Sequence, residues 1–195
     1  GPEGTSVATM LLAGIAIGAL AGSVGSLLEF YADNEMLRRI SLWRMGGLDG
    51  ANWSRVVIVA GVGALILAVL PRQAAALNAL LLGESEARHL GIAVDRVKRR
   101  LVLLTAAGVG VSVAVAGAIT FVGLVVPHIV RMLIGPDHRW LLPASAMAGA
   151  ILLLVADTLA RVVIAPAELP VGLLSALLGA PFFISLLRRR REYGL

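Results

Sequence analysis

The sequence predicts an all-α fold, a polytopic bundle of about six transmembrane helices. Of its 195 residues, 58% are hydrophobic and only 15% are charged, and the mean hydropathy is +0.90. A soluble domain is usually about half apolar and about a quarter charged. Several uncharged runs also approach the roughly 20 residues that a helix needs to cross a bilayer. We therefore expect a single transmembrane domain over residues 1–195 in a lipid bilayer.

Composition excludes several other classes of protein. The sequence has no cysteine, so disulfides and thiolate metal sites are excluded, and its three histidines lack the i, i+4 spacing of a helical metal pair. The net charge of +5 does not indicate a nucleic-acid partner, because the basic residues cluster in loops between apolar runs and in the tail. We expect no metal site, no bound cofactor and no catalytic residue in this chain.

Each apolar run is interpreted as a span that ends at a charge, a glycine or a proline. The expected spans are residues 7–28, 55–70, 101–116, 119–134, 141–164 and 170–187. The run from 101 to 134 is too long for one helix across a core about 30 Å thick and too short for two comfortable spans. We therefore predict a break at Gly117, followed by a short helix.

The orientation follows from Lys and Arg in the short loops. Basic residues are concentrated in the segment 72–100, in the turn 136–140 and in the tail 188–191. With alternating crossings these three segments fall on one side, which the positive-inside rule makes cytoplasmic. The C-terminus is then cytoplasmic, and the segment 29–55 lies on the periplasmic side.

Small residues repeat every four positions in the first span, at Gly14, Gly18, Gly22 and Ser26. This spacing lets two helices approach closely. The repeat indicates either packing against another helix of the same subunit or a subunit interface or pathway wall.

A short helix is predicted outside the membrane from Asp33 to Met45, ended by Gly46. One interpretation is an interfacial helix that rests on the membrane, with Trp43 as an aromatic anchor. The other is a lid over a pore, in which Arg38 and Arg39 face an acidic partner or an anionic substrate.

The segment 72–100 contains the run LNALLLGESEARHLGI. It predicts two short helices joined at Gly83, the second with a Glu84–Arg88 pair and Gly91 as its C-terminal cap. Such an element suits insertion into a groove on a soluble protein. A solvated loop would not need so many leucines, so docking is the favoured interpretation.

Four polar residues lie within the apolar spans. Asp157 and Arg161 fall near the outer end of their span, which favours a local ion pair or helix-end contact over a proton relay. His128 has no matching nucleophile or acid motif, so a packing role is favoured over catalysis. Arg131 can reach the cytoplasmic interface by snorkelling, and Pro127 permits a kink.

The chain resembles the FecCD/BtuC-like permease family of ABC importers for iron-siderophores, haem and vitamin B12. The resemblance is carried by LNALLLGESEARHLGI, by AGAITFVGLVVPHIVRMLIGPDHRWLLPASAMAGAILLLVADTLAR and by PAELPVGLLSALLGAPFFISLLRR, and it covers nearly the whole chain. It matches helices five to ten of a ten-helix type II importer permease. The resemblance therefore implies that the chain is the C-terminal half of a larger permease whose first four helices are absent.

The resemblance implies a permease in the bacterial inner membrane that pairs with a second copy of itself. Two cytoplasmic ATPase subunits, which bind ATP and Mg²⁺, would lie below it, and a periplasmic substrate-binding protein would deliver substrate above. By this resemblance the residues that couple to the ATPase are Leu82, Gly83, Glu84, Ala87, Arg88, Leu90 and Gly91.

The same resemblance implies roles for three further elements. The helix from Gly14 to Ser26 would line the pathway near the dimer axis, and the helix from Asp33 to Met45 would gate its outer end. Arg161 matches an arginine that meets a carboxylate on the binding protein, which favours docking over pairing with Asp157.

The motifs EARHLGIAVDRVKRRL and LWRMGGLDGANW look most like the haem-import members, so haem is the expected substrate, with ferric siderophore next and cobalamin third. The sequence has no GxxxxGK[ST] loop, so ATP hydrolysis is expected on a partner. A rival class is an ion-coupled secondary transporter with Asp157, His128 or Glu168 as proton carriers, and a third is an intramembrane enzyme that uses His128.

Overall fold

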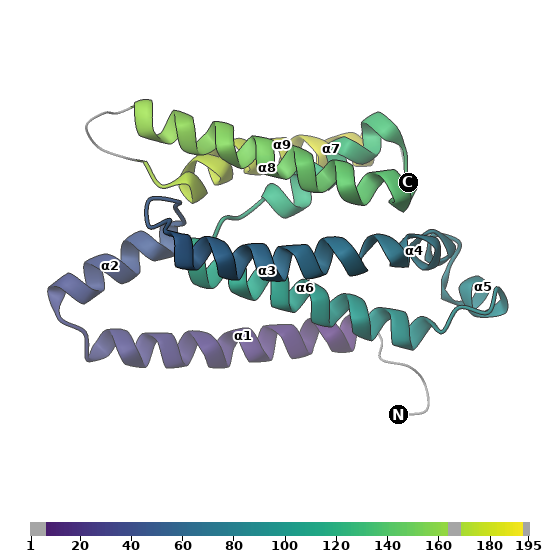
Figure 1. The fold of residues 1–195 in the computed structure, drawn as a ribbon, viewed down its shortest axis with the longest axis horizontal. Coiled ribbons are helices and arrows are strands. Elements are labelled where there is room, and N and C mark those ends of the chain that lie inside the picture. Colours follow the sequence, from purple (N-terminus) through teal and green to yellow (C-terminus); the bar gives the residue numbers. More distant parts are fainter. Residues whose placement is uncertain (1–6, 164–168, 193–195) are drawn as a thin grey trace. The chain divides into compact units, whose positions relative to one another are not determined.

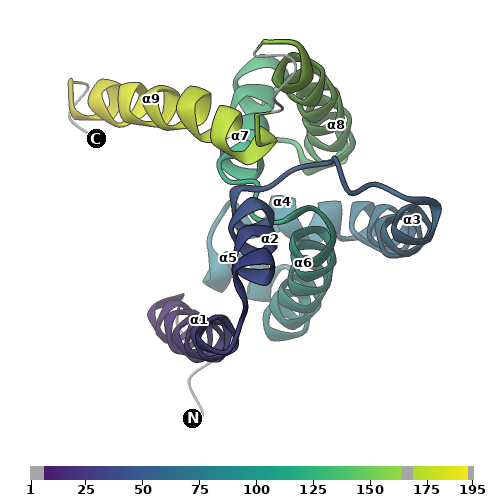
Figure 2. The ribbon, with the colours of Figure 1, turned by 90° about the vertical axis from the view of Figure 1, so that its left-hand side faces the viewer.

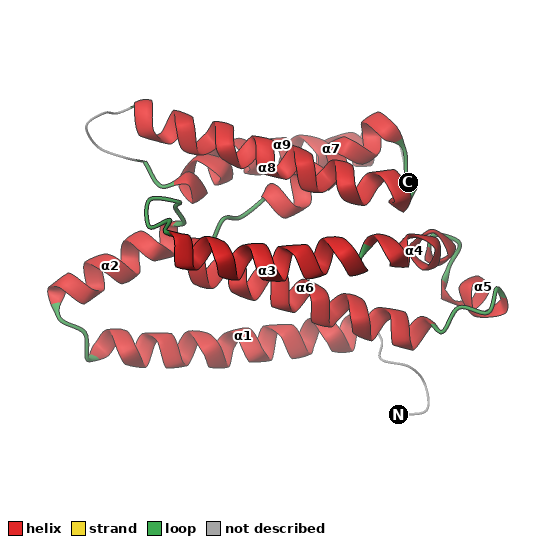
Figure 3. Ribbon diagram, in the orientation of Figure 1, coloured by secondary structure: helices red, strands yellow, loops and turns green. Residues whose placement is uncertain are grey.

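The computed structural model describes residues 7–163 and 169–192 of the chain. Within these residues all regular structure is helical, with short loops and no strand (Figure 3). The prediction of an all-α protein is therefore confirmed. Glu168, one of the possible proton carriers named above, lies outside the described residues.

The helices succeed one another with one 3-10 helix, η1, between the third and the fourth. Their bounds are α1 Val7–Phe30, α2 Asn34–Met45, α3 Trp53–Val69, η1 Pro71–Gln73, α4 Ala74–Leu80, α5 Glu84–His89, α6 Val94–Ala116, α7 Val122–Ile134, α8 His138–Val162 and α9 Val171–Glu192. The chain divides into two compact units, residues 1–42 and 43–195, so the boundary falls inside α2. The single permease domain over residues 1–195 stays a prediction.

The first unit consists of α1 and most of α2. Gly14, Gly18 and Gly22 lie along one face of α1, because residues four apart in a helix share a face. At the start of α2 the Asp33 carboxylate accepts a hydrogen bond of 2.8 Å from the backbone N–H of Met36. Asp33 therefore caps the N-terminus of α2.

In the second unit α3 lies beside α6 and α7 lies beside α8 (Figure 1). Helix α9 contacts both α7 and α8, and the view turned by 90° shows its N-terminal part against them (Figure 2). Two small apolar clusters join these helices. One consists of Val126, Val130 and Leu141, and the other of Ala156, Ala160 and Val171.

Four helical stretches are long and apolar enough to cross a membrane, at residues 9–30, 53–80, 94–116 and 138–162, the second of which takes α3, η1 and α4 together. Two shorter apolar helices cover residues 122–134 and 171–182. Each predicted span therefore corresponds to a helix, and the count of about six crossings stays a prediction. Large apolar side chains are exposed along α3, α6 and α8, as expected of surfaces that face lipid.

Helix α6 begins at Val94, earlier than the predicted start at Leu101. The basic stretch VDRVKRR therefore forms roughly the first two turns of the helix. Lys and Arg are disfavoured in the membrane core but not in a helix that projects beyond it. For the same reason α9 extends to Glu192, past the predicted end at Leu187.

The predicted break at Gly117 is confirmed. Helix α6 ends at Ala116, and Gly117 has a φ of +72°, a conformation that favours glycine. Helix α7 begins at Val122, after Phe121 takes a φ of +66°. With 13 residues, α7 is about 20 Å long, shorter than the membrane core.

Pro127, His128 and Arg131 all lie inside α7. The helix continues past Pro127, which has no N–H to donate to the preceding turn. His128 is half-buried and Arg131 is exposed. The packing role for His128 stays a prediction.

Candidate functional site

Helices α4 and α5 form a bent element at one end of the second unit, which we call the elbow (residues 74–91; right-hand end of Figure 1). Gly83 caps the start of α5 with a φ of +106°, and Gly91 follows its end with a φ of +80°. These conformations favour glycine and allow the chain to bend sharply at both places. The two predicted helices and their glycine breaks are therefore confirmed.

The elbow rests on the first turns of α6. Ala87 is completely buried, and Val94 and Val97 of α6 are buried as well. The N–H of Ile92 donates a hydrogen bond of 3.0 Å to the carbonyl oxygen of Ala87, which ties the end of α5 to the chain that enters α6. The position of α5 is thus determined by close packing at a small side chain.

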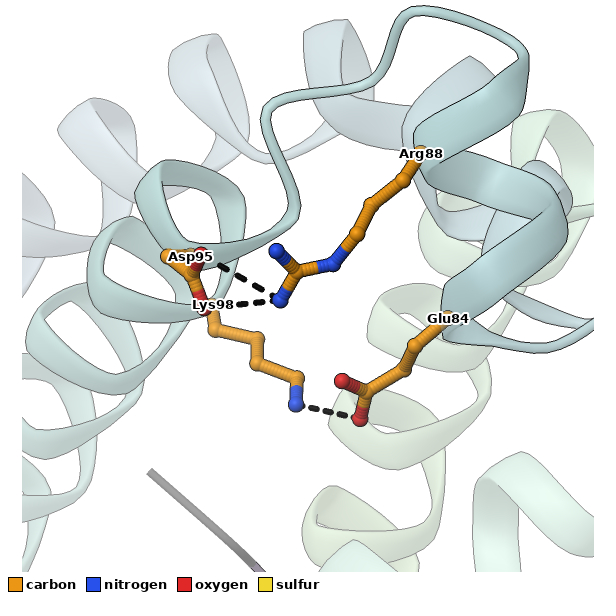
Figure 4. Close-up of polar contacts among 4 residues, drawn as sticks. All are labelled: Glu84, Arg88, Asp95 and Lys98. Atoms are coloured by element: carbon orange, nitrogen blue, oxygen red, sulfur yellow. Dashed lines mark hydrogen bonds and ion pairs between the residues drawn. The ribbon is translucent and has the colours of Figure 1, made fainter. Parts of the chain in front are cut away.

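Two ion pairs link α5 to α6 (Figure 4). Lys98 pairs with Glu84, and the Arg88 guanidinium lies 3.3 Å from both carboxylate oxygens of Asp95. The predicted Glu84–Arg88 pair is wrong. Both side chains instead turn toward α6, because Lys98 and Asp95 at the start of that helix offer them opposite charges. Helix α5 has only six residues, so both of its ends lie close to α6.

The elbow exposes three leucines among charged side chains. Leu81, Leu82 and Leu90 are 51%, 66% and 63% exposed. Among the predicted coupling residues Ala87 is buried, whereas the exposed ones are Leu82, Gly83, Glu84, Arg88, Leu90 and Gly91. Exposed leucines beside ion pairs match an interface with an apolar centre and a polar rim.

The turn between α7 and α8 lies against the elbow. Asp137 caps α8 by accepting a hydrogen bond of 3.0 Å from the N–H of Arg139, and it accepts another of 2.7 Å from the Asn78 side chain of α4. These two hydrogen bonds, that from Arg139 foremost, lower the pKa of Asp137 below its usual value. The carboxylate therefore stays ionised at neutral pH.

The same contact places two basic segments, 72–100 and 136–140, at one end of the second unit. This is the arrangement that the predicted topology requires. The side chains of the tail 188–191 lie outside the description, and the cytoplasmic assignment of this end stays a prediction.

At the other end of the second unit, three glycines bring separate backbone segments together, and we call them the glycine junction (Gly46, Gly117 and Gly172). The N–H of Gly47 donates to the carbonyl oxygen of Ala116 at 2.9 Å. The N–H of Gly172 donates to the carbonyl oxygen of Gly46 at 3.1 Å. The end of α2, the end of α6 and the start of α9 therefore meet through their main chains.

The glycine junction has no room for side chains. A Cβ atom added at Gly117 would lie 1.9 Å from the carbonyl oxygen of Trp43, and one at Gly172 would lie 2.1 Å from that of Met45. Gly46 and Gly117 also have positive φ angles. The sequence predicted the turns at Gly46 and Gly117 but not the contact between them.

The predicted gate residues fall in two environments. Trp43, in the second unit, donates an indole N–H to the carbonyl oxygen of Ala114 at 3.3 Å. This contact ties the end of α2 to α6. In the first unit Arg38 and Arg39 are exposed, and Arg39 lies 3.4 Å from the carboxylate of Glu35. Their roles in gating or docking stay predictions.

Arg161 pairs with Asp157 on α8. Its Nε and Nη2 atoms donate to the two carboxylate oxygens at 2.8 Å and 3.3 Å, and the arginine remains exposed. The family resemblance favoured docking of Arg161 over a pair with Asp157, and the expected absence of this pair is wrong, because the two side chains form it. The docking role itself stays a prediction.

Sequence reasoning missed three partners at the elbow, namely Asp95, Lys98 and Asn78. The signal for Asn78 was its position as the only polar residue in the leucine-rich run 77–82, which indicates a side chain that needs a hydrogen-bonding partner. Among the described residues, no three His, Cys, Asp or Glu side chains come together as they would around a metal ion.

These observations define the class of protein. Long lipid-facing helices, a short helix after a glycine break and an elbow of two short helices are the features of a polytopic helical membrane protein. The chain belongs to the FecCD transport family, whose model matches residues 2–189. The family resemblance stated from the motifs is confirmed.

The chain is similar to permeases with different named substrates. It is 52% identical over 189 residues to the hemin transport system permease protein HmuU of Yersinia pestis, covering 96% of this chain and 56% of that protein. It is 46% identical over 191 residues to the cobalamin import system permease protein BtuC of Halobacterium salinarum, covering 98% and 51%. The chain thus spans about half the length of these relatives.

A solved structure also matches, that of an ABC transporter assigned to the metal-chelate type in an inward-facing conformation. The TM-score is 0.88 at 34% identity, and the match covers 95% of this chain and 60% of that one. The helix arrangement described above therefore agrees with that of a solved transporter.

Proposed function

We propose that the protein is the membrane permease of an ABC importer that moves haem, or another iron chelate, across the bacterial inner membrane. The observation that carries this proposal is the elbow, which presents three exposed leucines at the basic end of the second unit. Under this proposal that end is cytoplasmic. The elbow then lies where an ATPase subunit can bind it.

The elbow has the properties of an element that transmits force. Close packing at Ala87 holds it against α6, and the two ion pairs add partly exposed contacts to the same helix. Leu82 and Leu90 remain exposed and can enter an apolar groove on the partner. A movement of the partner is then passed to α6 as a displacement of α5.

Under this proposal ATP and Mg²⁺ bind to a separate ATPase subunit, as the family implies. The residues of this chain contain no GxxxxGK[ST] loop. By analogy with the family, the complex contains two copies of the permease, two ATPase subunits and a periplasmic binding protein. Substrate passes between the two permease copies, beside the helices that carry Gly14 and Arg38.

Haem is the first substrate candidate because the hemin permease is 52% identical to this chain. Cobalamin is the alternative, supported by 46% identity to a cobalamin permease, and ferric siderophores follow. The test is to purify the permease with its ATPase and binding protein and to identify the ligand. A Soret absorption band supports haem, whereas a corrinoid or siderophore spectrum replaces it with the alternative.

A second measurement tests the transport class. The complex is reconstituted in vesicles with its ATPase subunits facing the lumen. These vesicles should accumulate external substrate only when ATP is enclosed in the lumen. Uptake driven by a proton gradient, in the absence of any ATPase, would instead support the secondary transporter.

A further inference from the structure

Asn78 connects the elbow to the transmembrane helix α8. Its side chain lies on α4 and reaches the first residues of α8. The Nδ2 atom donates to Asp137 Oδ1 at 2.7 Å. The Oδ1 atom lies 2.9 Å from the backbone nitrogen and 2.8 Å from the Nδ1 atom of His138.

The polarity of these hydrogen bonds determines how each group is oriented. The backbone N–H of His138 can only donate, so it must meet the oxygen of the Asn78 amide. The ionised Asp137 carboxylate can only accept, so it must meet the amide nitrogen. The remaining bond then requires a hydrogen on Nδ1 of His138. All three groups thus fit one arrangement without conflict.

Asn78 also completes the cap of α8. The Asp137 carboxylate accepts the N–H of Arg139, and the N–H of His138 is left for another acceptor. That acceptor comes from α4, a different helix. Because the first N–H groups of a helix have no partner within it, the start of α8 depends on the position of α4.

The connection is partly shielded from water. Asn78 and Asp137 are half-buried, whereas His138 is only 9% exposed and Ala74, one turn before Asn78 on α4, is 3% exposed. Leu141, one turn further along α8, is 3% exposed. A polar group that loses its partner here cannot be fully compensated by solvent, so the connection resists separation.

These contacts make α4 a rigid link between two parts. On one side it leads through Gly83 to α5, and on the other it is hydrogen-bonded to α8. Helix α8 runs without interruption to Val162 and carries the Asp157–Arg161 pair near its far end. A displacement of the elbow therefore reaches α8 directly, in addition to the route through α6.

We propose that Asn78 is a positioning residue that transmits movements of the elbow to α8 during the transport cycle. This inference rests on the proposed function, because it assumes an ATPase subunit that moves the elbow. It assigns to α4 a role distinct from that of α5: α5 binds the partner, and α4 conveys the displacement to the membrane helices.

The experiment compares three variants in the purified complex of permease, ATPase and binding protein, reconstituted in vesicles. The variants are Asn78→Ala, Asn78→Asp and the exchange Asn78→Asp with Asp137→Asn. ATPase binding, ATP hydrolysis and substrate uptake are measured together. The quantity of interest is the number of substrate molecules transported per ATP hydrolysed.

Asn78→Ala is expected to bind the ATPase as the wild type does but to transport about tenfold less substrate per ATP, since three partly buried hydrogen bonds between α4 and the start of α8 are lost. Asn78→Asp should be at least as impaired, because it places a second carboxylate against Asp137. The exchange should recover part of the coupling, because the amide nitrogen at position 137 then donates to the new carboxylate. The N–H of Arg139, which shares Oδ1 of Asp137 with Asn78 in the wild type, must then turn to the amide oxygen. That carboxylate still accepts from both nitrogen atoms of His138.

Two results would overturn the inference. One is wild-type transport per ATP in Asn78→Ala. The other is a folded exchange variant that is no better coupled than Asn78→Asp, and this comparison decides the matter if Asn78→Ala does not fold. Failure of the proposed function looks different, because the wild-type permease would then not bind an ATPase or show ATP-dependent uptake.

Discussion

The N–H of Gly172, at the start of α9, donates a hydrogen bond of 3.1 Å to the carbonyl oxygen of Gly46, directly after α2. The same stretch of backbone after α2 reaches the end of α6 through Gly47 and Ala116. Three helix ends are therefore joined by main-chain contacts, with glycine at each point of closest approach. This junction and the elbow lie at opposite ends of the second unit.

Replacement of Gly117 by alanine tests the junction. The added Cβ would lie 1.9 Å from the carbonyl oxygen of Trp43, at a residue with a φ of +72°. We expect the apparent unfolding temperature of the purified protein in detergent to fall by more than about 5 °C. The measurement is thermal unfolding followed by circular dichroism.

The matched control is Gly149→Ala on α8, where an added Cβ meets nothing within 4 Å. Alanine is a better helix former than glycine, so this variant should unfold at the same or a higher temperature. Equal effects of the two substitutions would contradict the steric account of the junction.

Reversal of charge at Lys98 tests the ion pair that binds α5 to α6. Lys98→Glu should weaken ATPase binding by up to about fivefold, because a partly exposed pair contributes no more than about 1 kcal/mol. Exchange of both charges, Glu84→Lys with Lys98→Glu, should recover most of that loss. Binding is measured by titration of the ATPase subunit, and an exchange variant as weak as Lys98→Glu alone would refute the pairing.

Substitution of Leu82 tests the docking surface itself. Leu82 is 66% exposed, so Leu82→Asn should leave the permease folded. ATPase binding should weaken at least about tenfold if the leucine enters an apolar groove. Leu82→Met keeps the volume and the apolar character and should bind nearly as the wild type does. Unchanged binding of Leu82→Asn would remove the leucine from the interface.

Arg161 and Asp157 allow docking to be separated from the local ion pair. Arg161→Glu should lower the affinity for the substrate-binding protein, and the loss should be largest at low salt because exposed charges are screened. Asp157→Asn removes the local pair but keeps the arginine, so it should leave the affinity the same or higher. If both variants weaken binding equally, the pair acts only as a structural contact of α8.

Much of the fold was predictable from local sequence. Uncharged apolar runs locate the long helices, since a membrane helix must satisfy its backbone hydrogen bonds within itself. Gly117 marks the break between α6 and α7, because the apolar run 101–134 is too long to cross the membrane as a single helix. Gly83 and Gly91 likewise mark the ends of α5, at positions where positive φ angles favour glycine.

Helix ends were predictable only where a residue disfavours helix. The start of α6 was missed because VDRVKRR is charged, which locates the membrane boundary and not the helix boundary. The end of α2 was predicted because glycine at position 46 disfavours helix, and in the structure Gly46 has a positive φ angle.

The sequence by itself determined the class of the protein, the order of its helices and the position of the elbow between two of them. Only the tertiary structure decided that Arg88 pairs with Asp95, that Asn78 caps α8 and that Gly172 meets Gly46. The reason is that periodicity and backbone preference act between neighbours in the chain. Side-chain partners and close backbone approaches depend instead on which distant segments the folded helices bring together.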